Sequence, residues 1–582
     1  MRPFAADVAA GKRFELGGSV KHYKGKSLFY QALLGSGVHD LFGNPGTTEM
    51  PLIDGLTDHP EMRYWLALHE GVAVGMADAF AFATGMPGVA NVHVAPGLGN
   101  ALGMLYNAWE GRSPVLLTAG QQDTRMRLRE PLLSHDLVAM AAPLVKFSAQ
   151  AERAGEIPLL VHRALKTMSE APSGPAFLSL PINVMEEESD APVLARWPAP
   201  RAAVPHPEDV AAAAELLLEA RHPAIVCGEG VYRANAQREL VALAELLGAP
   251  VWNTVLPAAL NFPMTHPQYR GELPGDIARI RQAFGPADAV LLVGGDFFKE
   301  IFHAPGSPIA DGAGVIQIDA APRMLARNYA PAVAIAADPA AALQAVRERL
   351  LSGAGAAYHD TADARRTAQA GLARAEKQKQ EARLKRGWSQ SPLAPARVMW
   401  ELKGALPEHG IVVSEAITAN ADLTRTLSLE RPGDYFGSRG GGIGQGLPTA
   451  LGVQVAYPDR RVVCVSGDGS AMYSIQALWT AAHHRLPVVF VILANRVYRI
   501  LKINMDRYRG DFGVGGERPY PHMDLADPDL GFVRIAEGLG VPARRIDDPE
   551  QLALALRAAF AAGTPYLLEV LVEGTWPARD RP

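Results

Sequence analysis

Short apolar runs alternate with helical patterns along most of the chain. Near the N-terminus, DLFGNPG and GVANVHVAPG are typical of buried strands, and EGVAVGMADAFAFATG has the apolar spacing of a helix. Strands that alternate with helices in this way predict a parallel sheet covered by helices. The helix expected over 70–84 consists mostly of glycine, alanine and larger apolar residues, so we expect another backbone to pack very close to it, deep in an interface.

The alternation recurs in three blocks. A Pro-rich stretch, APVLARWPAPRAAVPHPEDV, separates the first block from a second that contains PAIVCGEGV, DAVLLVGGD and AGVIQIDAA. A third contains GIVVSEA, RVVCVSGDG, LPVVFVILAN and PYLLEVLVE, and its layout is similar to that of the first, as if one doubly wound fold had been used twice. We therefore predict an α/β protein with three doubly wound parallel-sheet domains at 26–195, 205–352 and 392–582, an N-terminal extension over 1–25, and a solvated linker helix within 353–391.

Composition excludes several classes of protein. Hydrophobic residues make up 48% and charged residues 20% of the 582 residues, which is typical of a globular protein. The net charge of -5 provides no basic face for a run of phosphates, so we expect no nucleic-acid partner. We recognise neither a secretory leader nor an apolar run of about 18 residues, so we expect no membrane partner and a cytoplasmic location. The two cysteines, Cys227 and Cys464, lie in apolar runs, which argues against a disulfide framework and a zinc site.

The strongest chemical signal is a strand followed by the turn GDGS at 467–470, then a helix, then a second strand that ends at Asn495. Neighbouring parallel strands deliver both polar side chains at the same edge of a sheet. Mg²⁺ prefers oxygen ligands and completes its shell with phosphate oxygens and water, so we expect Asp468, Asn495 and a backbone carbonyl near Val497 to bind it. The flanking glycines favour a diphosphate beside the metal. Alone, the turn would be equally typical of a plain strand-to-helix connection.

Glu70 opens the helix expected over 70–84, whose other residues are mostly small or apolar. Burial of this carboxylate would raise its pKa and let it share a proton near neutral pH. Thiamine diphosphate needs such a group, hydrogen-bonded to its pyrimidine ring, before its thiazolium carbon can react. The alternative is a first-turn carboxylate stabilised by the helix dipole. Together with the metal signal, Glu70 favours the catalytic interpretation.

A glycine-dense turn, GGGIGQGLP at 440–448, precedes a helix of the third block. Thiamine diphosphate reacts only when it is bent, with a bulky aliphatic side chain under the bend, and Ile443 fits that requirement. The carbonyl of Gly441 is then expected to accept a hydrogen bond from the pyrimidine amino group. Such a turn could equally open the dinucleotide site of a flavin- or nicotinamide-dependent oxidoreductase, but the acidic ribose-binding residue about 20 positions further on is missing.

The chain resembles a known family from about residue 26 onward. LFGNPGTTEMPL, HEGVAVGMADAFA, GGGIGQGLPTALGVQ and SGDGSAMYSIQALWTAA are similar to segments of thiamine-diphosphate-dependent 2-oxo acid decarboxylases, above all the benzoylformate decarboxylases and their acetolactate-synthase-like relatives. The resemblance implies that the three domains are pyrimidine-binding, central and diphosphate-binding. It also implies a homodimer or a dimer of dimers, that is a homotetramer, with active sites at the subunit interface and Glu70 facing the diphosphate site of its neighbour.

The resemblance assigns roles to further residues. Thr47 lies where the decarboxylases have a serine that holds the substrate carboxylate, and His93 lies where they have a histidine suited to proton transfer after carbon dioxide leaves. A histidine expected from the central domain is matched only by His303, displaced by about two positions, and for both histidines a purely structural role is the alternative. The residues expected to bind the cofactor are Asn44, Pro45, Gly46, Glu70, Thr418, Gly441, Ile443, Gly467, Asp468, Gly469, Ser470, Tyr473 and Asn495.

The implied activity is the thiamine-diphosphate-dependent, non-oxidative decarboxylation of a 2-oxo acid, with carboligation as a second outcome. Two alternatives stay open: an acetolactate-synthase-like carboligase that joins two 2-oxo acids, and a non-catalytic paralogue that only binds the cofactor. The expected cofactors are thiamine diphosphate and Mg²⁺, whereas FAD, present in some acetolactate synthases, has no decisive signature here. The basic segment from Arg499 to Arg509 either faces a second carboxylate or phosphate of the substrate or forms a solvated lid.

Overall fold

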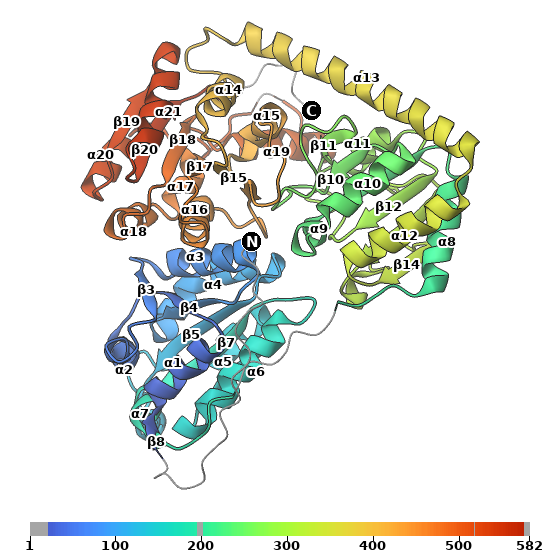
Figure 1. Ribbon diagram of the computed structural model, residues 1–582. Coiled ribbons are helices and arrows are strands. Elements are labelled where there is room, and N and C mark those ends of the chain that lie inside the picture. Colours follow the sequence, from blue (N-terminus) through green and yellow to red (C-terminus); the bar gives the residue numbers. More distant parts are fainter. Residues whose placement is uncertain (1–20, 195–201, 517, 576–582) are drawn as a thin grey trace.

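The computed structural model describes residues 21–194, 202–516 and 518–575. Its strands form three six-stranded parallel sheets, each flanked by helices, and the three α/β units meet near the centre of the molecule (Figure 1). This confirms the predicted fold class. Residues 1–20 of the expected N-terminal extension lie outside the described residues. Within the described part, β1 (Tyr23–Lys24) pairs with β8 (Glu188–Ser189), which ties the start of the first unit to its end.

The first sheet has the strand order β3-β2-β4-β5-β7-β6. Its strands all pair in parallel, as strands joined by helical crossovers do. β4 and β5 are buried along their whole length, which explains their continuous apolar sequences. The strands are β2 (Asp40–Gly43), β3 (Arg63–Leu66), β4 (Gly88–Val92), β5 (Val115–Gln121), β6 (Phe147–Gln150) and β7 (Ala176–Pro181), and the main helices are α1 (Gly25–Gly35), α2 (Met50–Gly55), α3 (Glu70–Thr84), α4 (Val94–Glu110) and α6 (Ile157–Ser169).

The third sheet has the order β16-β15-β17-β18-β20-β19, which repeats the topology of the first when strands are counted along the chain. The prediction that one doubly wound fold is used twice is therefore confirmed. The strands are β15 (Ile411–Glu415), β16 (Tyr435–Gly437), β17 (Val462–Gly467), β18 (Val489–Ala494), β19 (Ala543–Ile546) and β20 (Tyr566–Leu571), and the helices include α14 (Pro395–Ala405), α15 (Asn420–Thr426), α16 (Gly446–Ala456), α17 (Asp468–Met472), α18 (Ala477–His483), α19 (Arg499–Asp511), α20 (Phe532–Gly538) and α21 (Leu552–Ala561).

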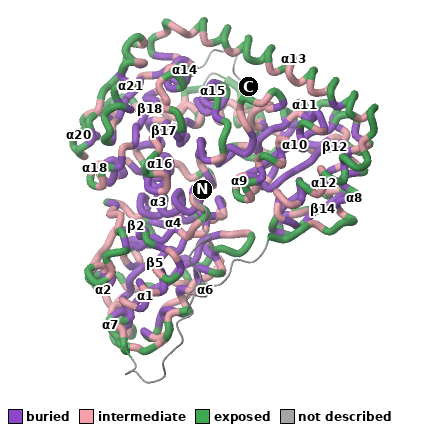
Figure 2. Tube along the Cα trace, in the orientation of Figure 1, coloured by how far each residue is buried: buried purple, intermediate pink, exposed green. Residues whose placement is uncertain are grey.

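The central sheet has a different order, β11-β10-β9-β12-β13-β14, which is the order of dinucleotide-binding folds. The long helix α13 (Ala356–Arg386) then leads to the third unit, and Ala362 is its one buried residue, as expected of a solvated linker helix (Figure 2). No helix in the described ranges is both long and apolar enough to span a bilayer. The strands are β9 (Pro223–Cys227), β10 (Val251–Asn253), β11 (Tyr269–Glu272), β12 (Ala289–Val293), β13 (Gly314–Asp319) and β14 (Val333–Ala336), and the helices include α8 (Pro207–Glu219), α10 (Gln237–Leu247), α11 (Ile277–Phe284) and α12 (Pro339–Gly353).

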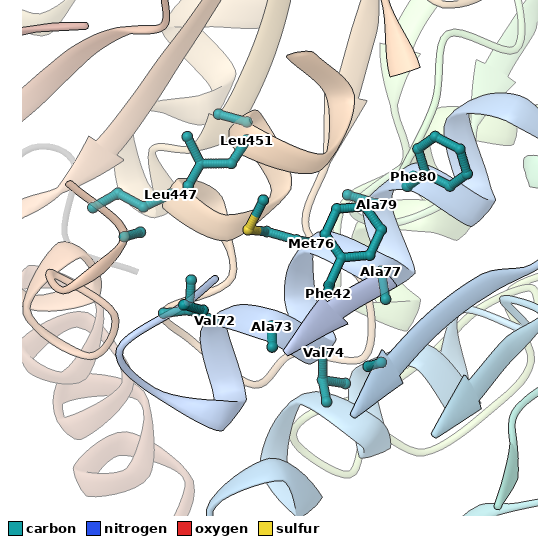
Figure 3. Packing of buried hydrophobic residues seen from close by; sticks show 14 of the residues in the cluster. Phe42, Val72, Ala73, Val74, Met76, Ala77, Ala79, Phe80, Leu447 and Leu451 are labelled. Atoms are coloured by element: carbon teal, nitrogen blue, oxygen red, sulfur yellow. The ribbon is translucent and has the colours of Figure 1, made fainter. Parts of the chain in front are cut away.

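Helix α3 packs directly on α16 and so joins the first and third units. A Cβ at Gly75 would lie 2.7 Å from the Cβ of Pro448, and a Cβ at Gly452 would lie 2.3 Å from the carbonyl oxygen of Met76. Gly75 and Gly452 are therefore required by the close approach of the two helices, which the small residues of 70–84 predicted. Figure 3 shows the side chains that pack between the helices, among them Val72, Met76, Ala79, Leu447 and Leu451.

Candidate active site

Asp468 is the first residue of α17 and follows directly on β17. The residue is 4% exposed, and its carboxylate accepts hydrogen bonds from the amide of Gly469 at 2.8 Å and from the amide of Arg496 at 2.6 Å. Burial raises the pKa of this carboxyl, while the surrounding backbone amides act in the opposite direction. A desolvated carboxylate at the edge of a sheet is a group that a bound cation would stabilise.

Asn495 follows β18, the strand beside β17, so the two expected metal ligands extend from neighbouring strand ends. Its Oδ1 accepts from the amide of Val497 at 3.0 Å, and the carbonyl of Val497 accepts from the amide of Arg499 at 2.9 Å and keeps a second lone pair. A carboxylate, a carboxamide and a carbonyl are oxygen donors of the kind that Mg²⁺ takes. The described residues contain no group of three or more His, Cys, Asp or Glu side chains placed for a metal, so this donor set depends on further oxygens from a ligand and water.

The glycine turn of the third unit is held by a buried carboxylate that sequence reasoning missed. Glu415, at the end of β15, accepts from the amides of Gly444 at 2.8 Å, Gln445 at 3.2 Å and Gly446 at 2.8 Å. Burial raises the pKa of Glu415 to about 7, against the effect of these amides. Since the three amides directly follow Ile443, the position of the Ile443 side chain depends on Glu415.

A side chain of the first unit reaches the same turn. Asn107, on α4, donates to the carbonyl of Gly442 at 3.1 Å and accepts from its amide at 3.0 Å. Gly440 adopts a φ of +68°, and a Cβ there would lie 2.7 Å from the Asn107 Oδ1. Gln445 folds back to donate to the same Gly442 carbonyl at 2.7 Å. The turn that presents Gly441 and Ile443 is thus fixed from both units.

The loop after β2 and the end of β4 come together around His93. The ring Nδ1 lies 2.8 Å from Oε2 of Glu49 and 3.3 Å from the hydroxyl of Thr48. Glu49 is 1% exposed, and its carboxylate also accepts from the amides of Gly46 at 2.8 Å and Gly120 at 2.7 Å. Glu49 therefore fixes the orientation of the histidine. Thr47, the predicted substrate-binding hydroxyl, is exposed at the same loop.

Glu70 is the first residue of α3, and His69 caps that helix by accepting from the amide of Gly71 at 3.0 Å. Asn100, on α4, donates to the Glu70 carboxylate at 3.1 Å. The expected burial of Glu70 is wrong for the described chain, because Glu70 is partly exposed although the rest of the first turn of α3 is buried. Full burial of this carboxylate would need a covering surface other than the residues that the structure describes.

Two residues beside predicted site residues have a left-handed backbone that their side chains disfavour. Val94 follows His93 with a φ of 37°, and Ile417 precedes Thr418 with a φ of 46°. A third, Arg496, lies between the expected metal ligands Asn495 and Val497 and has a φ of 59°. Positive φ is costly for branched side chains, so the surrounding structure must hold these positions. Such strain is often found where a backbone is fixed for binding or catalysis.

The predicted residues thus gather at the carboxyl ends of strands in two sheets. In the first sheet they follow β3, β2 and β4, which are neighbours, and in the third they follow β15, β17 and β18, which are neighbours too. Ligands of open α/β sheets bind at such edges. The first set comprises Asn44, Pro45, Gly46, Thr47, Glu70 and His93, and the second comprises Thr418, Gly467, Asp468, Gly469, Ser470, Tyr473, Asn495 and Val497, with Gly441 and Ile443 held to the end of β15.

Three family models match this chain in sequence. They are described as the N-terminal TPP binding domain, the central domain and the C-terminal TPP binding domain of thiamine pyrophosphate enzymes, and they match residues 23–140, 210–346 and 418–570. Together they cover most of the chain, in the same order as the three sheets. The protein is a thiamine pyrophosphate enzyme. Its cofactors are thiamine diphosphate and Mg²⁺, and FAD is not indicated.

Characterised relatives of this thiamine pyrophosphate enzyme match it over nearly its whole length. Benzoylformate decarboxylase of Pseudomonas aeruginosa is 37% identical over 94% of this chain and 98% of that protein. The large subunit of acetolactate synthase isozyme 3 of Escherichia coli is 28% identical over 92% of each chain. Among solved structures, the thiamine diphosphate-dependent 4-hydroxybenzoylformate decarboxylase of Rhodococcus jostii RHA1 is similar with a TM-score of 0.82 and 30% identity, over 95% of this chain and 100% of that one.

The residues of this thiamine pyrophosphate enzyme fit its cofactor. Gly469 packs against the Tyr498 ring so closely that a Cβ would lie 2.5 Å from it, which leaves the backbone after Asp468 bare. Gly444 is equally constrained, with the Cβ of Tyr473 2.4 Å from where its own would be. Both glycines are therefore required by packing against a tyrosine, and the fit to the cofactor rests on the oxygen donors of Asp468, Asn495 and Val497.

A cavity of about 400 Å³ opens beside Asn495, between the ends of β18 and β20. Apolar side chains form most of its wall, and Lys502 and Tyr520 lie at its side. Asn495 and Val497 line it, so the cavity adjoins two of the expected metal ligands, whereas Asp468 and the glycine turn at 440–448 lie outside its lining. Its remaining lining residues are Pro392, Ala494, Arg496, Leu571, Val572, Gly574 and Thr575.

His303 lies on an exposed loop of the central unit, after β12. The neighbouring Phe302 ring lies 5.0 Å from the guanidinium carbon of Arg507 on α19, so this loop contacts the helix that follows the metal site. No hydrogen bond or ion pair found among the described residues joins His303 to Glu70, His93 or Asp468. A catalytic role for His303 stays a prediction.

The basic segment from Arg499 to Arg509 lies in α19, and several of its charged side chains bind other residues of the same chain. Lys502 pairs with Asp524 at 2.5 Å, and Arg507 pairs with Asp276 of the central unit at 2.8 Å. Arg509 donates to the carbonyls of Arg518 at 3.0 Å and of Pro519 at 2.6 Å. These contacts favour a lid tied to neighbouring loops over a row of side chains aimed at a substrate.

Proposed function

We propose that this thiamine pyrophosphate enzyme catalyses the non-oxidative decarboxylation of a 2-oxo acid. The observation that carries the proposal is the pairing of His93 with the buried Glu49, beside the hydroxyl of Thr48 and on the loop that also carries Thr47. A fixed histidine next to hydroxyl groups suits a reaction that binds a carboxylate and later delivers a proton. The relatives named as decarboxylases of benzoylformate and 4-hydroxybenzoylformate support an aromatic 2-oxo acid as the first substrate to test.

When bound, thiamine diphosphate supplies an electron-accepting ring that takes up the charge released as carbon dioxide leaves. In the proposal, the Asp468 carboxylate, the Asn495 side chain and the Val497 carbonyl hold Mg²⁺. Ile443 supports the bend of the cofactor, and the Gly441 carbonyl accepts from its pyrimidine amino group. These residues bind and orient, and the protons are moved by Glu70 and His93.

The hydrogen bond to Glu49 determines which ring nitrogen of His93 can transfer a proton. A carboxylate accepts, so Nδ1 of His93 carries the proton that it donates at 2.8 Å. Nε2 is then the nitrogen that can take up and deliver a proton. The hydrogen bond to Glu49 also holds the ring in one orientation, which suits a proton donor. Thr47 is proposed to hold the substrate carboxylate beside it.

We propose a homodimer or a dimer of dimers in which Glu70 serves the site of the neighbouring subunit. Support comes from the surface around the site: Met50 and Leu68 are 53% and 46% exposed, and Tyr473, after the metal turn, is 59% exposed. Large apolar side chains that are exposed together near a site are typical of a contact surface. A neighbouring subunit would also complete the burial of Glu70.

The second candidate is carboligation, in which the acyl unit left by decarboxylation is joined to another carbonyl compound. The 28% identity with the E. coli acetolactate synthase subunit over 92% of the chain supports it. The two activities share the binding of cofactor and first substrate. They differ in whether a proton or a second substrate reacts next, which is why both products must be followed.

The test is to incubate purified protein with thiamine diphosphate, Mg²⁺ and a panel of 2-oxo acids, among them benzoylformate, 4-hydroxybenzoylformate and pyruvate. Carbon dioxide, aldehyde and coupled products are measured. The proposal predicts carbon dioxide and aldehyde from at least one aromatic acid, and loss of both in Asp468→Ala. Cofactor binding without turnover of any acid would contradict the proposal and support the non-catalytic paralogue.

A further inference from the structure

One contact joins the third unit to the strand that leads to Glu70. Nε2 of His484, just after α18, accepts a hydrogen bond from the amide of Leu66 at 2.8 Å. Leu66 is the last residue of β3, which is the edge strand of the first sheet. On its inner side β3 pairs with β2, so its outward amides have no strand partner. His484 supplies that partner from 418 positions away.

The strand end that His484 holds is continuous with the start of α3. After Leu66, Ala67 donates to the carbonyl of Gly43 at 2.9 Å and accepts from Nδ2 of Asn44 at 2.7 Å. Leu68 and His69 complete the connection to Glu70. The segment is therefore fixed on its inner side by β2 and on its outer side by His484, and its short length transmits any shift to the Glu70 carboxylate.

The bond from Leu66 requires the neutral form of the imidazole. A protonated ring carries hydrogen on both nitrogens, so Nε2 can no longer accept from an amide. The carbonyl oxygen of Leu66 lies 3.3 Å from the same Nε2 and can accept from the protonated ring. On protonation, the hydrogen bond of His484 thus passes from the amide of Leu66 to its carbonyl, and the amide is left unpaired.

The surroundings of His484 favour the neutral ring. Burial lowers the pKa of His484, and so does the neighbouring His483, whose ring centre lies 4.7 Å away; the Leu66 carbonyl has the opposite effect. On the β3 side, the Trp65 ring centre lies 5.1 Å from that of His484, and the Arg63 guanidinium lies over the Trp65 ring. The Asp40 carboxylate accepts hydrogen bonds from both Arg63 and Trp65. The opposite charges of Arg63 and Asp40 are paired with each other.

We propose that His484 is a positioning residue, which in its neutral form holds the end of β3 and thereby places Glu70 for its role in the proposed reaction. The inference rests on the proposed function only for the role of Glu70. The contact itself, and its dependence on the protonation of the ring, concern the protein without cofactor and are tested separately.

The first experiment is hydrogen–deuterium exchange of the cofactor-free protein, followed in peptides that cover 63–70. At pH 7.5, His484→Ala is expected to speed exchange at the Leu66 amide by about tenfold, the factor for loss of about 1.4 kcal/mol of protection. His484→Gln, whose Oε1 can accept, is expected to keep most of the protection. The matched control is His483→Gln, because His483 is exposed and adjacent. Unchanged exchange in His484→Ala would overturn the proposal.

The second experiment is the pH profile of kcat/KM with the best 2-oxo acid. Glutamine does not titrate, so the activity of His484→Gln relative to the wild type is expected to rise as the pH falls below about 6.5, where histidine begins to be protonated. His483→Gln keeps the titrating ring of His484, so its profile should stay pH-dependent but move toward higher pH, because the neighbouring charge that lowers the pKa of His484 is gone. A ratio for His484→Gln that stays constant with pH contradicts the inference. Wild-type protein inactive on every acid would instead refute the proposed function, and the exchange experiment would still decide the contact.

Discussion

Asn107 of the first unit binds Gly442 of the third by both ends of its side chain, with Nδ2 3.1 Å from the carbonyl oxygen and Oδ1 3.0 Å from the amide nitrogen. The asparagine is 1% exposed, so water cannot replace either bond. The helix that carries it, α4, begins directly after His93 and also carries Asn100, which donates to Glu70. Helix α4 therefore contacts both the glycine turn at 440–448 and Glu70, and it begins at the residue after His93.

Replacing Asn107 is expected to weaken cofactor binding. Asn107→Ala leaves the Gly442 amide unpaired and its carbonyl with Gln445 as its remaining partner, which loosens the turn that carries Gly441 and Ile443. Loss of two buried hydrogen bonds, at about 1 kcal/mol or more each, predicts a Kd for thiamine diphosphate at least about tenfold higher by calorimetry. Asn107→Asp keeps the acceptor but turns the donor into a repelling oxygen, so it should bind no better than Asn107→Ala. A Kd within about twofold of the wild type in both variants would refute this role.

Glu49→Gln is expected to slow turnover without preventing cofactor binding. The glutamine keeps the shape of the side chain but loses the carboxylate oxygen that accepts from Nδ1 of His93 and fixes its ring. Loss of such support for a working histidine predicts a kcat about 10- to 100-fold lower. Glu152→Gln is the control, since Glu152 is a half-exposed surface glutamate far along the chain. A Glu49→Gln enzyme with wild-type kcat would show that His93 does not depend on this partner.

The stability of the third unit is expected to fall as Glu415 ionises. The pKa of Glu415 in the folded chain is about 7, above the ordinary 4.5, so the folded form binds the proton more tightly than the unfolded form. The contribution of the protonated group is complete below pH 4.5 and is lost as the pH rises through 7. The loss is on the order of 1–3 kcal/mol. Between pH 5 and 8, the Tm of the wild type should therefore fall relative to that of Glu415→Gln, while exposed Glu408→Gln should show no such trend. A difference in Tm that is independent of pH would contradict the assignment.

Gly452→Ala is expected to destabilise the contact between α3 and α16. The new methyl group would lie 2.3 Å from the Met76 carbonyl oxygen, so the helices must move apart, at a cost of about 1–3 kcal/mol. The control is Gly371→Ala in α13, where no atom lies near the added Cβ and a small stabilisation of about 0.5–1 kcal/mol is expected. Thermal unfolding of the two variants checks both signs. Equal changes in Tm for the two variants would show that α3 and α16 have room for the added methyl group.

The sequence was sufficient where the chemistry is local. The neighbouring positions of Asp468 and Asn495 could be predicted because each directly follows an apolar strand, and parallel strands bring their ends together. Their roles as metal ligands stay predictions. Glu70 could be predicted because the pattern of its helix is unusual. Its burial could not, because exposure of a helix end depends on what packs around it in three dimensions.

The residues that the sequence did not reveal act through distant partners. Asn107 and Gly442 are 335 positions apart, and Glu49 accepts from an amide 71 positions away. Glu415 is the last residue of an apolar strand, and Asp468 directly follows one. An acidic residue at the end of an apolar strand was therefore the signal that could have revealed Glu415. No pattern along the chain says which backbone amides such a carboxylate will meet, because that is set by the packing of two units.

The central claim is that a magnesium-bound diphosphate lies at the ends of β17 and β18 and not elsewhere in the three units. The most direct measurement is a crystal structure with thiamine diphosphate and Mn²⁺ in place of Mg²⁺, with the metal located by its anomalous scattering. The account predicts one strong peak per chain within coordination distance of the Asp468 carboxylate, the Asn495 side chain and the Val497 carbonyl. A peak at any other place, or a bound cofactor whose diphosphate lies away from these residues, would contradict it.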